Sequence, residues 1–360
     1  MMVPPLSTLK TPADDAPTVI STFTGAGGSC LGFRWAGFRP LAAVEFVPDA
    51  AGCYRRNFPG VPVIERDVRE ISGWELLDAA GVAEVDVLEG SPPCASWSSA
   101  GSRAAGWGRE RRYSDVRQRT DDLLGEFVRL VAEVRPRVFV MENVPGLLAG
   151  AARGVYNQTV AGLMSAGYDV QARLLDASRL GVAQQRVRLI VIGVRTDLVH
   201  AEAGVTAAEC FPTPRPGAIA VGDALGALPP PDARELADRE AADFTGRAIH
   251  REWMREGDGG RSRYYMLRRA RLGEPCPTVT VASGARSAAG VTHPTEPRKF
   301  TPRELLALFG FPGDYDLGDG PFDKRYERVA RAVPPPLMQA VAERVALVLQ
   351  RAADRVSPAI

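Results

Sequence analysis

The most reactive candidate side chain is a cysteine that follows two prolines, in the run Pro92-Pro93-Cys94. Consecutive prolines stiffen a turn, and open α/β sheets place their ligands at the carboxyl ends of strands. A thiolate is the most nucleophilic protein side chain near neutral pH once its pKa is lowered. A deaminase zinc motif P-C-x-x-C would need a second cysteine where the chain has Trp97. Cys94 is therefore a candidate nucleophile, and a small buried cysteine is the ordinary alternative.

A second group of polar residues adjoins two later apolar runs. Glu142 follows the apolar residues 138–141, where a carboxyl group could give or share a proton. Arg186 and Arg188 stand two positions apart at the start of the next run, so a strand would point both to one face. Together they could clamp an anion or an acidic side chain. The alternatives are a structural glutamate paired with an arginine, and a surface ladder of arginines.

A glycine-rich turn, Phe23–Gly28, ends the first strand-like run and would let the backbone approach a ligand closely. The nicotinamide fingerprint G-x-G-x-x-G needs a glycine where the chain has Cys30, whereas G-x-G-G suits an adenosyl cofactor without a pyrophosphate. Glu45 ends the second run and could accept hydrogen bonds from both ribose hydroxyls. Asp67 could accept from an adenine amino group. Each acid could instead be a solvated loop residue.

The elements that must position these residues alternate between strand-like and helix-like segments. The strand-like segments are Thr18–Phe23, Leu41–Phe46, Val85–Leu88, Arg137–Met141, Tyr168–Leu175 and Val187–Val194. The helix-like segments are Asp121–Val134, the region of Gln158–Ser165, Pro302–Phe309 and about Pro336–Ala353. Strands that are apolar throughout, separated by helices, predict an α/β fold with a mostly parallel sheet covered on both faces.

Length and composition exclude several classes of protein. The 360 residues are 45% hydrophobic and 24% charged, so the chain can bury a core and form two domains. Lysine plus arginine is 44 against 43 acidic residues, which excludes a polycation but allows a local basic patch. The five cysteines lie far apart without a C-x-x-C motif, so we expect neither disulfides nor a cysteine zinc site. A reducing cytoplasm fits this cysteine usage, and no apolar run approaches the length of a membrane span.

The middle of the chain has a different character. Prolines mark loops, among them Pro229–Pro231. The segment Arg251–Arg271 carries seven arginines against three acidic residues, with Tyr264 and Tyr265 between them. We interpret residues 15–195 as a cofactor-binding and catalytic domain. Residues 196–300 would form a smaller irregular domain, and residues 301–360 would return to the first domain.

In this order and spacing the motifs resemble the cytosine-5 DNA methyltransferases, and the resemblance covers nearly the whole chain. Six family elements have a similar segment here. They are F-x-G-x-G-G at Phe23–Gly28, P-P-C at Pro92–Cys94, E-N-V at Glu142–Val144, Q-x-R-x-R at Gln184–Arg188, T-x-x-E-x-x-x-L-x-G-F-P at Thr301–Pro312 and A-V-P-P at Ala332–Pro335. The resemblance implies a Rossmann-like domain that depends on S-adenosyl-L-methionine, and it makes the smaller domain the one that recognises the target.

The resemblance also implies a mechanism without a metal. Cys94 would add to C6 of a cytosine flipped out of double-stranded DNA, and Glu142 would hydrogen-bond N3 and the exocyclic amine. Arg186 and Arg188 would hold the carbonyl oxygen of the base and the carboxylate. S-adenosyl-L-homocysteine would be the product. The implied cofactor residues are Phe23, Gly25, Ala26, Gly27, Gly28, Glu45, Phe46, Asp67, Val68, Pro93, Leu123, Arg331 and Val333.

The partner implied is DNA. The Gly- and Ser-rich loop Ala95–Asp115 would close over the duplex, and Arg251–Arg271 would face its major groove. A cognate restriction endonuclease is a further candidate partner, and we expect a monomer acting at the nucleoid in the cytoplasm.

Two positions depart from the family pattern. Ala95 stands where glutamine is usual, and Arg331 stands where the closing element usually has asparagine. The alternatives are a transfer-RNA cytosine-5 methyltransferase and a catalytically silent DNA-binding homologue.

Overall fold

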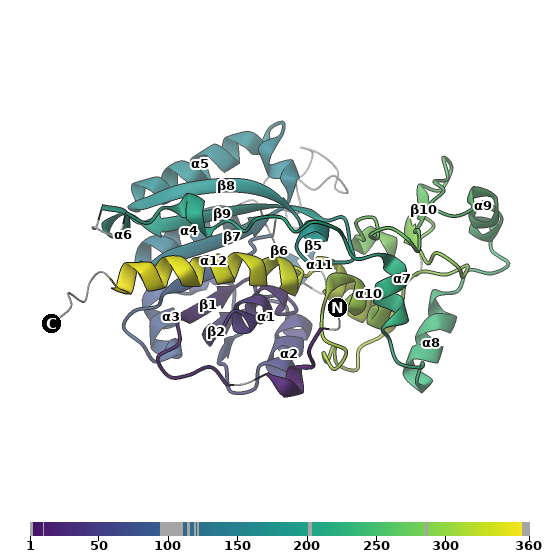
Figure 1. The fold of residues 1–360 in the computed structure, drawn as a ribbon, viewed down its shortest axis with the longest axis horizontal. Helices are drawn as coiled ribbons and strands as arrows, with labels where there is room; N and C mark the ends of the chain where they lie inside the picture. The colour runs from purple at the N-terminus through teal and green to yellow at the C-terminus, as the bar shows by residue number, and fades with distance from the viewer. Residues whose placement is uncertain are drawn as a thin grey trace. The chain divides into compact units, whose positions relative to one another are not determined.

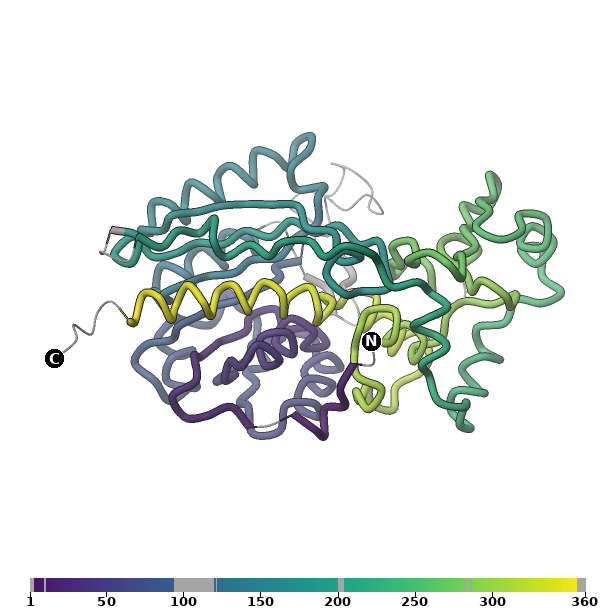
Figure 2. Tube along the Cα trace, viewed as in Figure 1, coloured from purple at the N-terminus to yellow at the C-terminus, as the bar shows by residue number. Residues whose placement is uncertain are grey.

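The computed structural model describes residues 3–9, 11–93, 111–113, 116–118, 120, 122–200, 204–284 and 287–354. Cys94 and Ala95 lie outside these residues, together with most of the loop that the sequence predicts after them. The chain divides into two compact units, and Figure 2 traces how it passes between them. The sheet unit comprises Lys10–Leu175, Val187–Thr213 and Met338–Ile360. The smaller unit comprises Met1–Leu9, Asp176–Arg186 and Pro214–Leu337.

A seven-stranded sheet in the order β3-β2-β1-β4-β7-β9-β8 forms the centre of the sheet unit (Figure 1). Its strands are β1 (Thr18–Thr22), β2 (Arg39–Val44), β3 (Val63–Ile64), β4 (Val87–Gly90), β7 (Val138–Asn143), β8 (Tyr168–Asp176) and β9 (Val187–Arg195). The strands from β3 to β7 in that order pair in parallel, and β9 runs antiparallel to β7. The predicted α/β fold with a mostly parallel sheet is confirmed.

Helices cover both faces of this sheet. They are α1 (Gly28–Trp35), α2 (Pro48–Asn57), α3 (Gly73–Ala80), α4 (Leu123–Val134), α5 (Ala152–Ser165), α6 (Thr196–His200) and the part of α12 (Pro335–Asp354) from Met338 onward. On one face Ile20 and Leu88 pack with Phe127 of α4 in a continuous hydrophobic core. Since side chains alternate along a strand, Ser21 and Glu89 point to the other face. There Ser29 of α1 donates a hydrogen bond to Glu89.

Helix α4 illustrates why the sequence pattern predicts these elements well. Its buried residues Leu123, Leu124, Phe127, Leu130, Val131 and Val134 recur at helical spacing. The left-handed Arg135 ends the helix. In the same way α10 (Pro302–Phe309) begins with a capping box between Thr301 and Glu304 and ends at the left-handed Gly310. The bounds of α10 are those that the sequence predicts.

The smaller unit contains more helix than the sequence pattern suggests. Besides α10 it holds α7 (Val221–Gly226), α8 (Ala233–Ala242), α9 (Ala248–Glu256) and α11 (Phe322–Arg331), with the parallel pair β10 (Leu267–Arg269) and β11 (Gly290–Thr292). Residues 176–186 and 301–337 also pack in this unit, so its limits differ from the predicted boundaries at 195 and 300. The assignment of 196–300 to target recognition stays a prediction.

Two short strands lie at the end of the region predicted as a loop and directly after it. β5 (Arg111–Tyr113) and β6 (Val116–Gln118) pair antiparallel, with Arg112 opposite Arg117. Within the described ranges, every helix is too short or too polar to cross a bilayer.

Candidate active site

The turn after β1 is strained and open. Phe23 has φ 54°, and Gly25 and Gly27 have φ 53° and 79°. A positive φ is rare for a bulky residue such as Phe23 and is tolerated mainly at functional sites. A Cβ atom built on Gly25 would meet no atom within 4 Å, so there is free space beside the turn. Gly27 then caps α1, whose first N–H groups lie at the positive end of the helix dipole.

Glu45 ties this turn to the end of β2. The N–H of Gly25 donates to Oε2 and the N–H of Val47 donates to Oε1, both at 2.7 Å. Burial raises the pKa of the Glu45 carboxyl, and these main-chain donors partly offset the rise. A carboxylate has about four acceptor sites, so Glu45 keeps the capacity to accept a further hydrogen bond. That capacity fits a diol such as the two hydroxyls of a ribose.

Asp67 already accepts hydrogen bonds from the chain itself. It caps the short helix Val68–Glu70, where it accepts from the main-chain N–H of Arg69 at 3.1 Å and from the guanidinium of Arg69 at 2.8 Å. Arg69 also donates to Asp122 at 3.1 Å. Two other predicted cofactor residues, Val68 and Leu123, lie in the hydrophobic core. An adenine amino group would therefore have to use the second lone pairs of Asp67.

Glu142 forms an ion pair with Arg188 at the carboxyl end of β7. Oε1 of Glu142 and Nε of Arg188 are 2.8 Å apart, and both side chains are about nine-tenths buried. Burial lowers the pKa of Arg188, and the Glu142 carboxylate acts against that shift. Arg188 is the only ionic partner of Glu142 among the described residues. The pair holds one oxygen of the carboxylate in a fixed position.

Arg186 has different partners from Arg188, because it precedes β9 and does not take part in its pleat. Its guanidinium donates to the carbonyl oxygens of Val279, Ala330 and Ala332 at 3.0 to 3.2 Å. Phe309 lies under the same group, 4.9 Å from the ring centre. The side chain therefore fixes the backbone of residues 330–332, and its predicted contact with a base stays a prediction.

The segment that Arg186 fixes includes the predicted cofactor residue Arg331, and a second one, Val333, follows it directly. Val333 is buried, and Arg331 forms an ion pair with Glu327 one turn earlier on α11, with Nε 2.8 Å from Oε1. The long cation that departs from the family pattern thus binds an acid of its own helix. This arrangement gives Arg331 a structural partner.

The approach to Cys94 is described up to Pro93. β4 pairs with β7, which places Gly90 opposite Met141 and brings this approach beside Glu142. Asn143 donates from Nδ2 to the carbonyl oxygen of Pro92 at 3.2 Å. A Cβ atom on Gly90 would lie 2.4 Å from Oγ1 of Thr22, so only glycine fits there. Cys94 itself lies outside the described residues.

The sequence-based reasoning missed Glu89. This side chain is only 2% exposed and accepts a hydrogen bond from Oγ of Ser29 at 2.7 Å. Burial raises the pKa of Glu89 to about 7; the hydroxyls of Ser21 and Ser29 lower it, and the charge of Glu142 raises it further. The available signal was a carboxylate placed inside an otherwise apolar strand.

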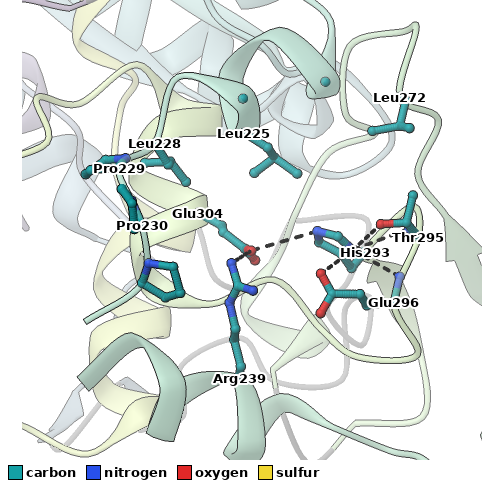
Figure 3. Close-up of a pocket in the computed structure, with 13 residues that line it drawn as sticks. Leu225, Leu228, Pro229, Pro230, Arg239, Leu272, His293, Thr295, Glu296 and Glu304 are labelled. Carbon is teal, nitrogen blue, oxygen red and sulfur yellow. Dashed lines mark hydrogen bonds and ion pairs between the residues drawn. The ribbon is translucent and has the colours of Figure 1, made fainter. Parts of the chain in front are cut away.

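A pocket of about 370 Å³ lies within the smaller unit (Figure 3). Its apolar wall includes Leu225 and Leu228, and its polar wall includes Arg239, His293 and Glu304. Burial lowers the pKa of His293 to about 4, so the imidazole is neutral near pH 7. The predicted catalytic and cofactor residues do not line this pocket.

Three comparisons place these features among known proteins. Residues 17–346 match the family model of C-5 cytosine-specific DNA methylases. The chain is 33% identical to the type II methyltransferase M1.HphI of Haemophilus parahaemolyticus over 341 residues, covering 91% of this chain and 86% of that protein. It is also 33% identical to the type II methyltransferase M.XorII of Xanthomonas oryzae pv. oryzae, over 72% of this chain and 55% of that protein.

A solved structure shares the fold. It is that of a candidate DNA modification methyltransferase encoded within an E. coli prophage, with a TM-score of 0.73 and 22% sequence identity. The match covers 93% of this chain and 99% of that chain.

Proposed function

The chain belongs to the C-5 cytosine-specific DNA methylase family, and on that premise we propose how it methylates cytosine in DNA. The observation that carries the proposal is the ion pair of Glu142 and Arg188, which stands beside the strand end that leads to Cys94. A carboxylate held in a fixed position suits the stabilisation of a cytosine ring that a nucleophile attacks.

The turn after β1 would hold the cofactor. When bound, S-adenosyl-L-methionine supplies an electrophilic methyl group and leaves as S-adenosyl-L-homocysteine. Glu45 would accept from its ribose, because the carboxylate keeps acceptor capacity beside its main-chain contacts. The open side of Gly25 would admit the ligand. Phe46, Asp67, Val68 and Pro93 would complete the part of the site that lies in the sheet unit, and the proposed mechanism needs no metal.

Each polar residue of the catalytic site has a separate task. The thiolate of Cys94 would attack C6 of a cytosine rotated out of the duplex, because C6 is out of reach in stacked DNA. Glu142 would hydrogen-bond N3 and the exocyclic amine, which stabilises the charge that develops on the ring. Arg188 would keep the Glu142 carboxylate in place. Arg186 would hold the backbone of residues 330–332 in place. C5, made nucleophilic by this addition, would then bond to the methyl group that the cofactor supplies, and loss of the C5 proton would finally eliminate the cysteine.

The middle of the chain would recognise the DNA. Residues 196–300 include the arginine-rich segment Arg251–Arg271, which suits a polyanion. Because relatives of this chain are type II methyltransferases, a cognate restriction endonuclease is a proposed partner. The protein would act as a monomer at the nucleoid in the cytoplasm.

Transfer of label from tritiated S-adenosyl-L-methionine tests the proposal. The purified protein is incubated with a duplex of mixed sequence or with a pool of transfer RNA, beside the Cys94→Ala variant. We expect label at C5 of cytosine in the duplex and none with the variant. Label only in RNA would show that the substrate is RNA and not DNA. Cofactor binding without label in either polymer would indicate a silent DNA-binding homologue.

A further inference from the structure

We propose that Tyr264 and Met266 form an apolar tip that contacts bases of double-stranded DNA and thereby selects the sequence that is methylated. The proposal rests on the proposed function, which makes DNA the partner. The tip belongs to residues 261–267 of the smaller unit, which connect the region after α9 to the start of β10 (Figure 1). We call these seven residues the tip segment.

The base of the tip segment is rigid. Ser262 is 2% exposed, and its Oγ donates to Oε1 of the buried Glu252 at 3.0 Å. The same oxygen accepts from the N–H groups of Tyr264 and Tyr265 at 3.2 and 3.3 Å. The N–H of Ser262 donates to the carbonyl oxygen of Leu267 at 2.9 Å, which closes the segment. One serine therefore fixes both ends of the turn.

A small hydrophobic cluster anchors this base. Leu267 and Trp253 are buried in the cluster, and Tyr265 packs against it. The guanidinium of Arg269 lies 3.8 Å from the centre of the Trp253 ring. Tyr265 is thus an anchor of the segment. Its neighbour Tyr264 points away from the cluster, so only one of the two adjacent tyrosines is available to a ligand.

The tip itself exposes two large apolar side chains to solvent. Tyr264 is 83% exposed and Met266 is 66% exposed. Met266 also has φ 53°, a left-handed conformation that glycine or asparagine adopts with less strain. Among the described residues only two other non-glycine residues share this feature: Phe23 in the cofactor turn and Arg135 at the end of α4. A strained, exposed methionine on a rigid base indicates selection for contact rather than for stability.

The charge around the tip fits DNA. Arg261, Arg263 and Arg268 are exposed beside Tyr264 and Met266. Contacts from arginine to phosphate orient a protein on the duplex but carry no sequence information, whereas apolar contacts to base edges do. The arginines would therefore hold the backbone, and the two apolar side chains would contact bases such as thymine through its methyl group.

The test uses the full-length protein with Met266→Gly and Tyr264→Ala, and Met164→Ala as the matched control. Met164 is 57% exposed and lies on α5 of the sheet unit, outside the segment proposed to contact DNA. Each protein methylates a duplex of mixed sequence with tritiated S-adenosyl-L-methionine, and the methylated cytosines are then located by sequencing. Calorimetric titration with the cofactor and a melting curve show whether each variant is folded.

We expect both tip variants to bind the cofactor as the wild type does, with a melting temperature for Met266→Gly at least as high. On the preferred sequence kcat/KM should fall about tenfold, and methylation should spread to other sequences, as expected when base contacts are lost. Met164→Ala should behave as the wild type. Unchanged site preference in both tip variants would overturn the proposal. If the wild type itself methylates no DNA, the proposed function fails, and this inference fails with it.

A phosphate-contact variant separates base contact from general DNA binding. Arg263→Ala should weaken binding about equally on all sequences and reduce the salt dependence of binding, with site preference unchanged. The same uniform loss in Met266→Gly would assign the tip to nonspecific binding and would contradict a role in sequence selection.

Discussion

The side chains of Glu142 and Arg188 meet across two antiparallel strands, with Oε1 and Nε 2.8 Å apart. Their positions are diagonal in the ladder, since Glu142 pairs with Ile190 and Arg188 stands two residues earlier. The charge-assisted hydrogen bond fixes one carboxylate oxygen, and in the proposed mechanism the other oxygen contacts the base. Substitution of Glu142 is therefore the most direct test of this geometry.

Replacing the Glu142 carboxylate by an amide should reduce the rate of the chemical step. Glu142→Gln keeps the size and can still accept from Arg188, but it cannot share a proton with a ring nitrogen. We expect kcat to fall by roughly 10² to 10³, the usual cost of losing one transition-state contact. Single-turnover methylation at saturating DNA measures it. A rate within a factor of two of the wild type would exclude a catalytic role for Glu142.

The ion pair should also appear as an energetic coupling. We expect the stability losses of Glu142→Gln and Arg188→Ala to be non-additive, with an interaction of about 1 kcal/mol or more because the charges are in contact and largely buried. Denaturant unfolding of the two single variants and the double variant gives the cycle. Strictly additive losses would mean that the two side chains act independently in solution.

Glu89 should make stability fall as the pH rises. Burial raises its pKa from 4.5 to about 7, so the folded protein binds this proton more tightly than the unfolded chain does. The stabilisation is therefore full below about pH 4.5 and is lost as the pH rises through about 7, for a total on the order of 3 kcal/mol. The matched variant Glu89→Gln can still accept from Ser29 but does not titrate.

Melting curves of the wild type and Glu89→Gln between pH 5 and 9 check this expectation. The stability of the wild type should decline relative to that of the variant across the interval. Parallel curves would show that Glu89 does not change its protonation in this range.

Arg331, which departs from the family pattern, should have little effect on the affinity for the cofactor. The side chain of Arg331 forms an ion pair with Glu327 of the same helix, and such pairs contribute roughly 0.3–0.5 kcal/mol. Arg331→Ala and Arg331→Asn should therefore change the affinity for S-adenosyl-L-methionine by less than about threefold. Calorimetric titration measures the affinity, with Glu45→Ala as the control expected to lose binding. A tenfold change in Arg331→Ala would place this side chain in the cofactor site.

The sequence by itself determined the class of the fold and most elements of the sheet unit. Every predicted strand is present within a few residues, because unbroken apolar runs between glycine and proline signals are local features of the chain. The bounds of α10 follow from a proline and a threonine–glutamate box at one end and a glycine at the other. The family also followed from residue types and spacing, since its motifs are short and contiguous.

The tertiary structure decided what each polar residue touches. Arg186 and Arg188 are two positions apart, yet one holds carbonyl oxygens and the other holds Glu142. Tyr264 and Tyr265 are adjacent, yet one is exposed and one packs on a cluster. Helices α7 to α9 were not predicted, because the prolines of this region were interpreted as loop signals. Partners, burial and the protonation of Glu89 depend on segments far apart in the chain, and no local pattern encodes which of them meet.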